Sequence, residues 1–152
     1  MKQNDDFISM IPELPAWNNG AGIAPEEWIA CVGNYQLAVG YSLIFWPRFV
    51  LFEGYLLREG FSEESLRGFE EVTNGNRVAV EAVMNHVHMI DIHCNDVEAN
   101  EAQLRYLGRL LKDIYTLKLK ADFPGLNVTV AFNDEPGLDL LDYELVFFQS
   151  AD

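Results

Sequence analysis

Residues 100–121 read NEAQLRYLGRLLKDIYTLKLKA, and this segment decides the fold class because it is the clearest amphipathic helix in the chain. Apolar residues recur in it at steps of three and four, which is the spacing of one face of an α-helix. The arginines and lysines lie at other positions. These apolar positions are Leu104, Leu107, Leu111, Ile114 and Leu117. The segment therefore predicts a long helix with one face in a core.

Two strands are predicted after this helix. Residues 127–132, NVTVAF, alternate in polarity, and residues 142–148, DYELVFF, follow a loop that contains Pro136 and Gly137. Such runs on either side of a turn are typical of an antiparallel β-hairpin. An isolated hairpin is only marginally stable in water, so a further strand or a helical layer must cover it. The strand-forming segment 49–57, FVLFEGYLL, is the candidate third strand, with a bulge at Gly54.

Three more helices are predicted before residue 100. Pro25 and the two glutamates behind it fit the first turn of one helix, and Ser62 with its two following glutamates fits the start of another. Asn74 and Gly75 should end the second helix, and a third should begin near Asn76 and carry the histidines. The expected fold is α+β: about four helices followed by a C-terminal antiparallel hairpin, in a single globular domain of residues 1–152.

Residues 28–47, WIACVGNYQLAVGYSLIFWP, carry no charge over a length that could cross a bilayer. The stretch contains Asn34 and Gln36, which would be costly in lipid, and glutamates rather than a lysine cluster precede it. A buried core helix that ends at Pro47 is therefore favoured over a membrane span, and we expect no membrane association.

The composition fits one acidic cytoplasmic domain. A chain of 152 residues with 49% apolar residues can bury a core without metal or disulfide support. Cys31 and Cys94 lie in unrelated contexts, which argues against a disulfide framework or a zinc site built on thiolates. The first ten residues lack an apolar run of signal-peptide length, so nothing suggests export.

The net charge of −14 is unevenly distributed. Residues 121–152 hold seven acidic residues and no lysine or arginine, whereas residues 105–120 hold five of the ten basic residues. This balance argues against binding to nucleic acid, which needs a basic surface. An acidic surface suits a basic protein partner, although solubility alone also accounts for it.

The segment HVHMIDIH at residues 86–93 contains all three histidines of the chain and is the candidate metal site. Its ligands would be His86, His88, Asp91 and His93. On a helix, His86 and His93 flank one side of the apolar face and His88 lies toward Asp91 on the other; on a strand, His86 and His88 share one side. Either geometry divides the four ligands into two pairs. The alternative interpretation is structural, with Asp91 at least half buried and paired with His88.

The segment NDEPGLDLLDYE at residues 133–144 carries five carboxylates around a turn. It lacks the Asp-x-Asp-x-Asp-Gly spacing of a calcium loop, and Pro136 interrupts any equivalent arrangement. A solvated loop and an acidic contact surface remain as interpretations. Leucines among the carboxylates favour contact. The candidate partner-binding residues are Asp134, Glu135, Asp139, Leu141 and Asp142.

Two functional hypotheses follow from these segments. The first is a non-enzymatic interaction module without a cofactor, for example an inhibitor or antitoxin-like protein that neutralises a basic partner. The alternative is a small metal-dependent hydrolase or lyase that binds zinc or another divalent transition metal through the histidine segment.

Overall fold

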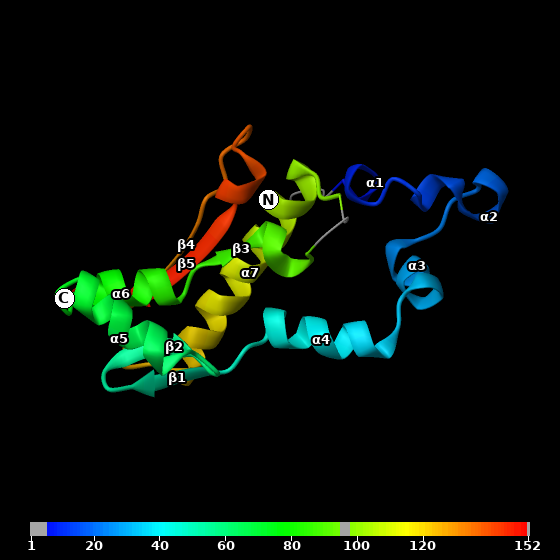
Figure 1. Ribbon diagram of the computed structural model, residues 1–152. Coiled ribbons are helices and arrows are strands. Elements are labelled where there is room, and N and C mark those ends of the chain that lie inside the picture. Colours follow the sequence, from blue (N-terminus) through cyan, green and yellow to red (C-terminus); the bar gives the residue numbers. More distant parts are fainter. Residues whose placement is uncertain (1–5, 95–97, 152) are drawn as a thin grey trace. The chain divides into compact units, whose positions relative to one another are not determined.

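The computed structural model describes residues 6–94 and 98–151 and has the predicted α+β fold, with helices and antiparallel strands (Figure 1). The chain divides into two compact units, Met1–Ser42 and Leu43–Asp152, so the predicted single domain stays a prediction. The helices among the described residues are α1 (Phe7–Met10), α2 (Trp17–Gly20), α3 (Pro25–Val32), α4 (Tyr35–Phe45), α5 (Glu63–Val72), α6 (Arg77–Met84) and α7 (Glu101–Asp122). The strands are β1 (Phe49–Phe52), β2 (Tyr55–Arg58), β3 (Val87–His88), β4 (Val128–Phe132) and β5 (Glu144–Gln149).

The predicted core helix over residues 28–47 was wrong. The stretch contains the end of α3 and the whole of α4, because the chain leaves the helical conformation at Gly33 and Asn34 caps the next helix by accepting a hydrogen bond from the backbone N–H of Leu37. No residue of α3 or α4 is buried. Among the described residues, no helix combines the length and the apolar character that a membrane span requires.

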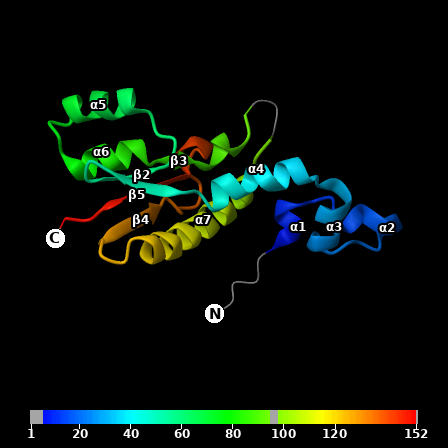
Figure 2. The ribbon, with the colours of Figure 1, turned by 90° about the horizontal axis from the view of Figure 1, so that it is seen from below.

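The second unit contains a three-stranded sheet in which β5 lies between β3 and β4 (Figure 1). The predicted hairpin is confirmed: β4 and β5 are antiparallel, with Val128 opposite Gln149 and Phe132 opposite Leu145. Burial alternates along β5, as expected for a strand with one covered face. Figure 2 shows these strands between α6 on one side and α7 on the other.

The third strand of this sheet is not the predicted segment 49–57. That segment folds back on itself as the separate antiparallel pair β1 and β2, with Phe52 opposite Tyr55. Glu53 and Gly54 both have positive φ angles, 50° and 87°, which is the geometry of a tight two-residue hairpin turn and not of a bulge. The strand beside β5 is β3, the two residues Val87 and His88.

The predicted helix at residues 100–121 is confirmed as α7. Asn100 caps it in a reciprocal arrangement with Gln103, so the N-terminal N–H groups of the helix are partly satisfied locally. The buried positions follow a slightly different stripe from the predicted one, because Leu117 is exposed and the stripe continues through Tyr115 and Leu119. These side chains pack with residues of β1, β2 and β5 in the main core.

The predicted starts of α5 and α6 are also confirmed, with Ser62 and Asn76 as their N-caps. The expectation that α6 carries the histidines was wrong. The helix ends at Met84, and the buried side chain of Asn85 then donates hydrogen bonds to the carbonyl oxygens of Leu56 and Phe147. These long-range contacts and the pairing of β3 with β5 outweigh the helical tendency of the segment.

Candidate functional site

The histidine segment crosses from a strand into a 3-10 turn. His88 lies on β3 opposite Glu144, and the imidazole rings of His86 and His88 meet edge to face with their centroids 5.1 Å apart. Asp91 lies on the turn η2 (Met89–Ile92), and His93 follows it. The structure thus brings the first two histidines together, as the strand geometry predicts.

Both paired histidines are oriented by backbone carbonyl groups. The Nδ1 atom of His86 is 2.6 Å from the carbonyl oxygen of Val83, and the Nδ1 atom of His88 is 2.8 Å from that of Leu141. A carbonyl oxygen only accepts, so both Nδ1 atoms carry the proton. In the neutral ring, Nε2 then has the free lone pair, which is the arrangement seen in metal-ligating histidines.

The four predicted ligands do not form one cluster. Within residues 6–94 and 98–151, no group of three or more histidine, cysteine, aspartate or glutamate side chains is placed to hold a metal ion. The expectation that Asp91 is at least half buried was wrong, because Asp91 is exposed. His88 instead has Glu144 as its acidic neighbour, at 3.6 Å between Nδ1 and Oε2. Metal binding by the segment stays a prediction.

The acidic loop forms a short 3-10 turn, η3 (Leu140–Asp142), that presents an apolar side chain between carboxylates. Leu141 is 61% exposed, and Asp139 and Asp142 on either side of it are also exposed. Asp139 caps the turn by accepting a hydrogen bond from the backbone N–H of Leu141 at 3.1 Å. The turn η3 is in contact with η2, which carries Asp91, so a further exposed carboxylate lies nearby.

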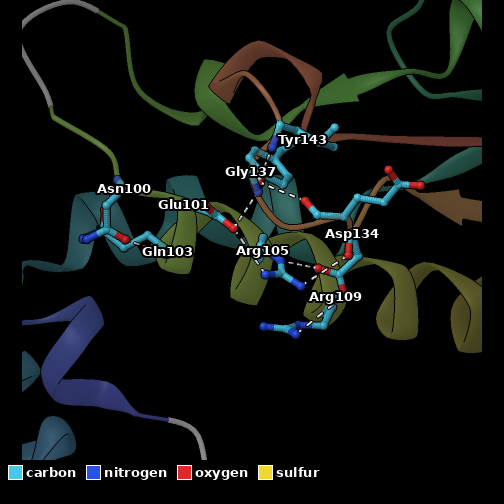
Figure 3. A network of polar contacts seen from close by, with 10 residues as sticks. Asn100, Glu101, Gln103, Arg105, Arg109, Asp134, Gly137 and Tyr143 are labelled. Carbon is cyan, nitrogen blue, oxygen red and sulfur yellow. Dashed lines mark hydrogen bonds and ion pairs between the residues drawn. The ribbon is translucent and has the colours of Figure 1, made fainter.

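A polar network attaches this loop to α7 (Figure 3). Arg105 donates from Nε to the carboxylate of Asp134 at 2.7 Å, and this hydrogen bond raises the pKa of Arg105 above its ordinary value. Arg109 lies 3.6 Å from the same carboxylate. Glu101 accepts hydrogen bonds from Arg105 and from the backbone N–H of Gly137. The negative charge of Asp134, one of the predicted partner-binding residues, is therefore balanced by ion pairs with Arg105 and Arg109 of the same chain.

Further contacts fix the loop from inside. Tyr143 is fully buried, and its hydroxyl donates to the carbonyl oxygen of Glu135 while it accepts from the N–H of Leu138. Asn133 donates to the carbonyl oxygen of Asp142, and His88 donates to that of Leu141. Glu135 itself is exposed. The loop is thus held in one conformation while Leu141 and its neighbouring carboxylates face solvent.

The structure also contains a buried polar cluster that the sequence analysis did not anticipate. Glu81 on α6 is fully buried and accepts three hydrogen bonds, from the backbone N–H groups of Leu56 and Gln149 and from the side-chain amide of Gln149. Asn85 lies one turn later and bonds to Leu56 and Phe147. The available signal in the sequence was a glutamate and an asparagine four residues apart among the apolar residues of 78–84.

The first unit contains an open hollow of about 830 Å³ that is separate from these groups. Its wall includes Phe7, Leu14, Ile23 and Pro25, together with the carboxylate residues Asp6 and Glu27. None of the predicted site residues lines it.

Comparison of the chain with models of protein families, with curated proteins and with solved structures found no match.

Proposed function

We propose that the protein is a non-enzymatic interaction module whose acidic turn η3 binds a basic protein partner. The observation that carries this proposal is Leu141, which is 61% exposed between two exposed carboxylates on a turn that hydrogen bonds hold in place. A preformed contact loop loses little conformational freedom on binding, so more of its interaction energy appears as affinity. An exposed leucine within a charged rim is typical of the centre of an interface.

The two kinds of residue in this turn have different roles in the proposal. Carboxylates that face solvent attract a basic partner and speed the encounter, whereas the apolar group holds the complex after it forms. Asp139, Asp142 and Glu135 are exposed and supply the attraction. Asp134 is engaged by two arginines of α7 and contributes structure to the loop. An inhibitor or antitoxin-like role is one form that such a module takes.

The double variant Asp139→Asn and Asp142→Asn is expected to associate with its partner several-fold more slowly than the wild type. Asparagine retains the oxygen that caps η3, so the turn keeps its conformation while two charges are lost. The measurement is a pull-down from native lysate at low salt, followed by surface plasmon resonance with the captured partner at two salt concentrations. The salt dependence of association should flatten in the variant.

A matched control separates the local effect from the change in net charge. Glu71→Gln with Asp113→Asn also removes two exposed carboxylates, but these lie on α5 and α7 and outside the loop.

Leu141→Ala should accelerate dissociation by about tenfold with little effect on association. If the wild type and the Asp139 and Asp142 variant recover the same proteins in equal amounts, the acidic turn does not bind a partner and serves only to keep the protein soluble.

We infer a second candidate function, the binding of a divalent transition metal by His86 and His88. The observation that favours it is the pair of Nδ1 hydrogen bonds to carbonyl groups, which leaves both Nε2 atoms as ligands. Two imidazoles in zinc coordination have ring centroids about 5 Å apart, given Zn–N bonds of about 2 Å, and the observed separation is 5.1 Å. Hydrolytic zinc sites use three protein ligands, so the pair favours metal binding over hydrolysis.

The three histidines allow a sharp test of this second candidate. Calorimetric titration with zinc and nickel is expected to show that His86→Ala and His88→Ala each weaken binding by more than about tenfold. His93→Ala and Asp91→Asn serve as matched controls, because both residues are exposed members of the same segment. Wild-type affinity in the two paired variants, or equal losses in all four, would contradict a site built on His86 and His88.

A further inference from the structure

The strand β4 forms one edge of the three-stranded sheet, because β5 lies on one side of it and no described strand lies on the other. The N–H of Ser150 donates to the carbonyl oxygen of Asn127 at 2.8 Å, and the N–H of Asn133 donates to that of Glu144 at 3.1 Å. Hydrogen-bonded positions alternate along an antiparallel pair, so the main-chain groups of the odd-numbered residues in β4 face β5. The N–H and C=O groups that face away from β5 are those of Val128, Val130 and Phe132.

These outward groups have no partner within residues 6–94 and 98–151. The strands β1 and β2 form a separate sheet, and β3 lies beyond β5. No hydrogen bond to the outward groups of β4 comes from a turn, a loop or a side chain of the described chain. Residues 6–42 of the first unit form helices and turns and no strand, so this part of the chain contains no strand that extends the sheet.

The edge also lacks the features that normally keep a further strand away. Unpaired edge strands in proteins usually carry a lysine, a proline or a bulge. The sequence of β4, VTVAF, contains no charged residue, proline or glycine. Its pairing with β5 is continuous from Val128 to Phe132, without a bulge. The edge is therefore open to one more strand, which is the mode of peptide binding called β-augmentation.

The helix α7 packs along β4 (Figure 2). Gly108 lies against the ring of Phe132. Arg105 and Arg109 both reach the carboxylate of Asp134, which follows the strand. These three helix positions define the side of α7 that faces β4 and its open edge.

The same side of α7 is basic along the rest of the helix. With about 100° per residue, Lys112 and Lys120 lie on the side of Arg109. Both lysines are exposed, and neither has an ion pair within the part of the chain that the structure describes. Lys118, on the opposite side, lies over an aromatic ring of β1. Asp113 is exposed and lies further toward solvent. Arg109, Lys112 and Lys120 together form the basic side of α7.

We propose that the edge of β4 binds an extended acidic segment of another protein as a fourth strand of the sheet. The side chains of Val128 and Val130 project toward α7 and pack against the main core. Residues of the added strand that lie opposite them project from the same face. Carboxylates at these alternate positions meet Lys112 and Lys120, while the main chain supplies the hydrogen bonds. The recognised segment thus has an acidic residue at every second position.

The basic side of α7 also argues against two other occupants of the edge. In a two-fold pairing of β4 with β4 of a second copy, both α7 helices lie on the same face of the joined sheet and their basic sides oppose each other. Two chains of net charge −14 repel one another as well. A basic segment is repelled by the exposed lysines. This surface therefore differs in partner chemistry from the acidic turn η3, and failure of one proposal leaves the other intact.

Fluorescence polarisation with the full chain tests the proposal, and the probe is a labelled, capped peptide in which glutamate alternates with threonine. The wild type should bind it with a dissociation constant below about 1 mM. A peptide with lysine in place of glutamate should bind at least about tenfold more weakly. Methylation of alternate peptide nitrogens, on the edge that faces β4, should abolish binding because it removes the donors and keeps the two strands apart.

Variants of the chain separate the two parts of the site. Lys112→Gln with Lys120→Gln should weaken binding of the glutamate peptide about fivefold, because two exposed charge contacts are lost. The control, Arg48→Gln with Arg77→Gln, also removes two exposed positive charges, which lie outside α7, and should bind as the wild type does. Val130→Pro removes an outward N–H without removing a hydrogen bond to β5 and should abolish binding.

Circular dichroism shows whether Val130→Pro is folded, and the methylated peptide tests the same edge on the unchanged chain if it is not. The proposal is overturned if the wild type does not bind the glutamate peptide, or if it binds the lysine or the methylated peptide equally well. Equal weakening in the Lys112 and Lys120 variant and in its control also overturns it. A wild-type dimer that Val130→Pro dissociates would identify a second copy as the occupant instead.

Discussion

Glu81→Ala is expected to lower the free energy of unfolding by about 3 to 5 kcal/mol, the range measured when one partner of a buried charged contact is removed. The carboxylate of Glu81 is fully buried and accepts hydrogen bonds of 2.8, 2.6 and 2.6 Å from Leu56 and Gln149. Alanine leaves these three buried N–H groups without an acceptor. Relief of the desolvation of the carboxylate offsets only part of this loss.

The loss should be large because Glu81 joins the two sheets of the second unit. The backbone N–H of Leu56 belongs to β2 and that of Gln149 to β5, and each donates to one oxygen of the same carboxylate. Glu81→Gln keeps one acceptor oxygen but turns the other into an amide group that faces a donor. We expect it to lower the free energy of unfolding by about 2 kcal/mol, between wild type and alanine.

Urea unfolding followed by near-ultraviolet circular dichroism measures these differences. Glu71→Ala is the matched control, because Glu71 is an exposed glutamate and its replacement should change the free energy of unfolding by no more than about 0.5 kcal/mol. If the free energies of unfolding of Glu81→Ala and Glu71→Ala differ by less than about 1 kcal/mol, the cluster does not hold the two sheets together.

Gly108→Ala is expected to lower the free energy of unfolding by about 2 kcal/mol, although alanine normally stabilises a helix. A Cβ atom at this position would overlap the ring of Phe132, which lies across from α7 on β4 and packs against the main core. Overpacking costs about 1 to 3 kcal/mol and here falls at the upper end, while the gain in helix propensity is about 1 kcal/mol.

Gly68→Ala provides the opposite expectation for the same chemical change. Gly68 lies inside α5, and an added Cβ would meet no atom within 4 Å. The substitution should therefore stabilise the protein by about 1 kcal/mol. Phe132→Leu removes the ring carbons that obstruct the methyl group, so Gly108→Ala should cost at least about 1 kcal/mol less in that background. If Gly108→Ala and Gly68→Ala change the free energy of unfolding equally, the ring of Phe132 does not obstruct the added methyl group and the prediction is wrong.

Local signals in the sequence are sufficient for several elements of this fold. The helix at residues 100–121 follows from its apolar spacing, and the starts of α5 and α6 follow from Ser62 and Asn76. The hairpin of β4 and β5 follows from alternation on both sides of a turn. Each of these signals acts over a few residues, which is why the chain alone displays it.

The sequence indicates which segments form the candidate sites, but not which of their side chains are paired within the chain. The acidic loop and the two neighbouring histidines stand out by composition, but the neutralisation of Asp134 by Arg105 and Arg109 does not. The separation of charge was the available signal, since a basic helix precedes an acidic segment that lacks lysine and arginine. Which carboxylate an arginine reaches depends on how α7 packs on the sheet.

By itself the sequence determined the fold class, the principal helix and hairpin, and the acidic character of the loop. The tertiary structure decided where α6 ends, which strand completes the sheet and which histidines meet. The physical reason is that these features depend on contacts between distant residues. Asn85 bonds to backbone groups 29 and 62 residues away, and such pairings outweigh the local helical tendency of the histidine segment. They exist only once β2, β5 and α6 have assembled.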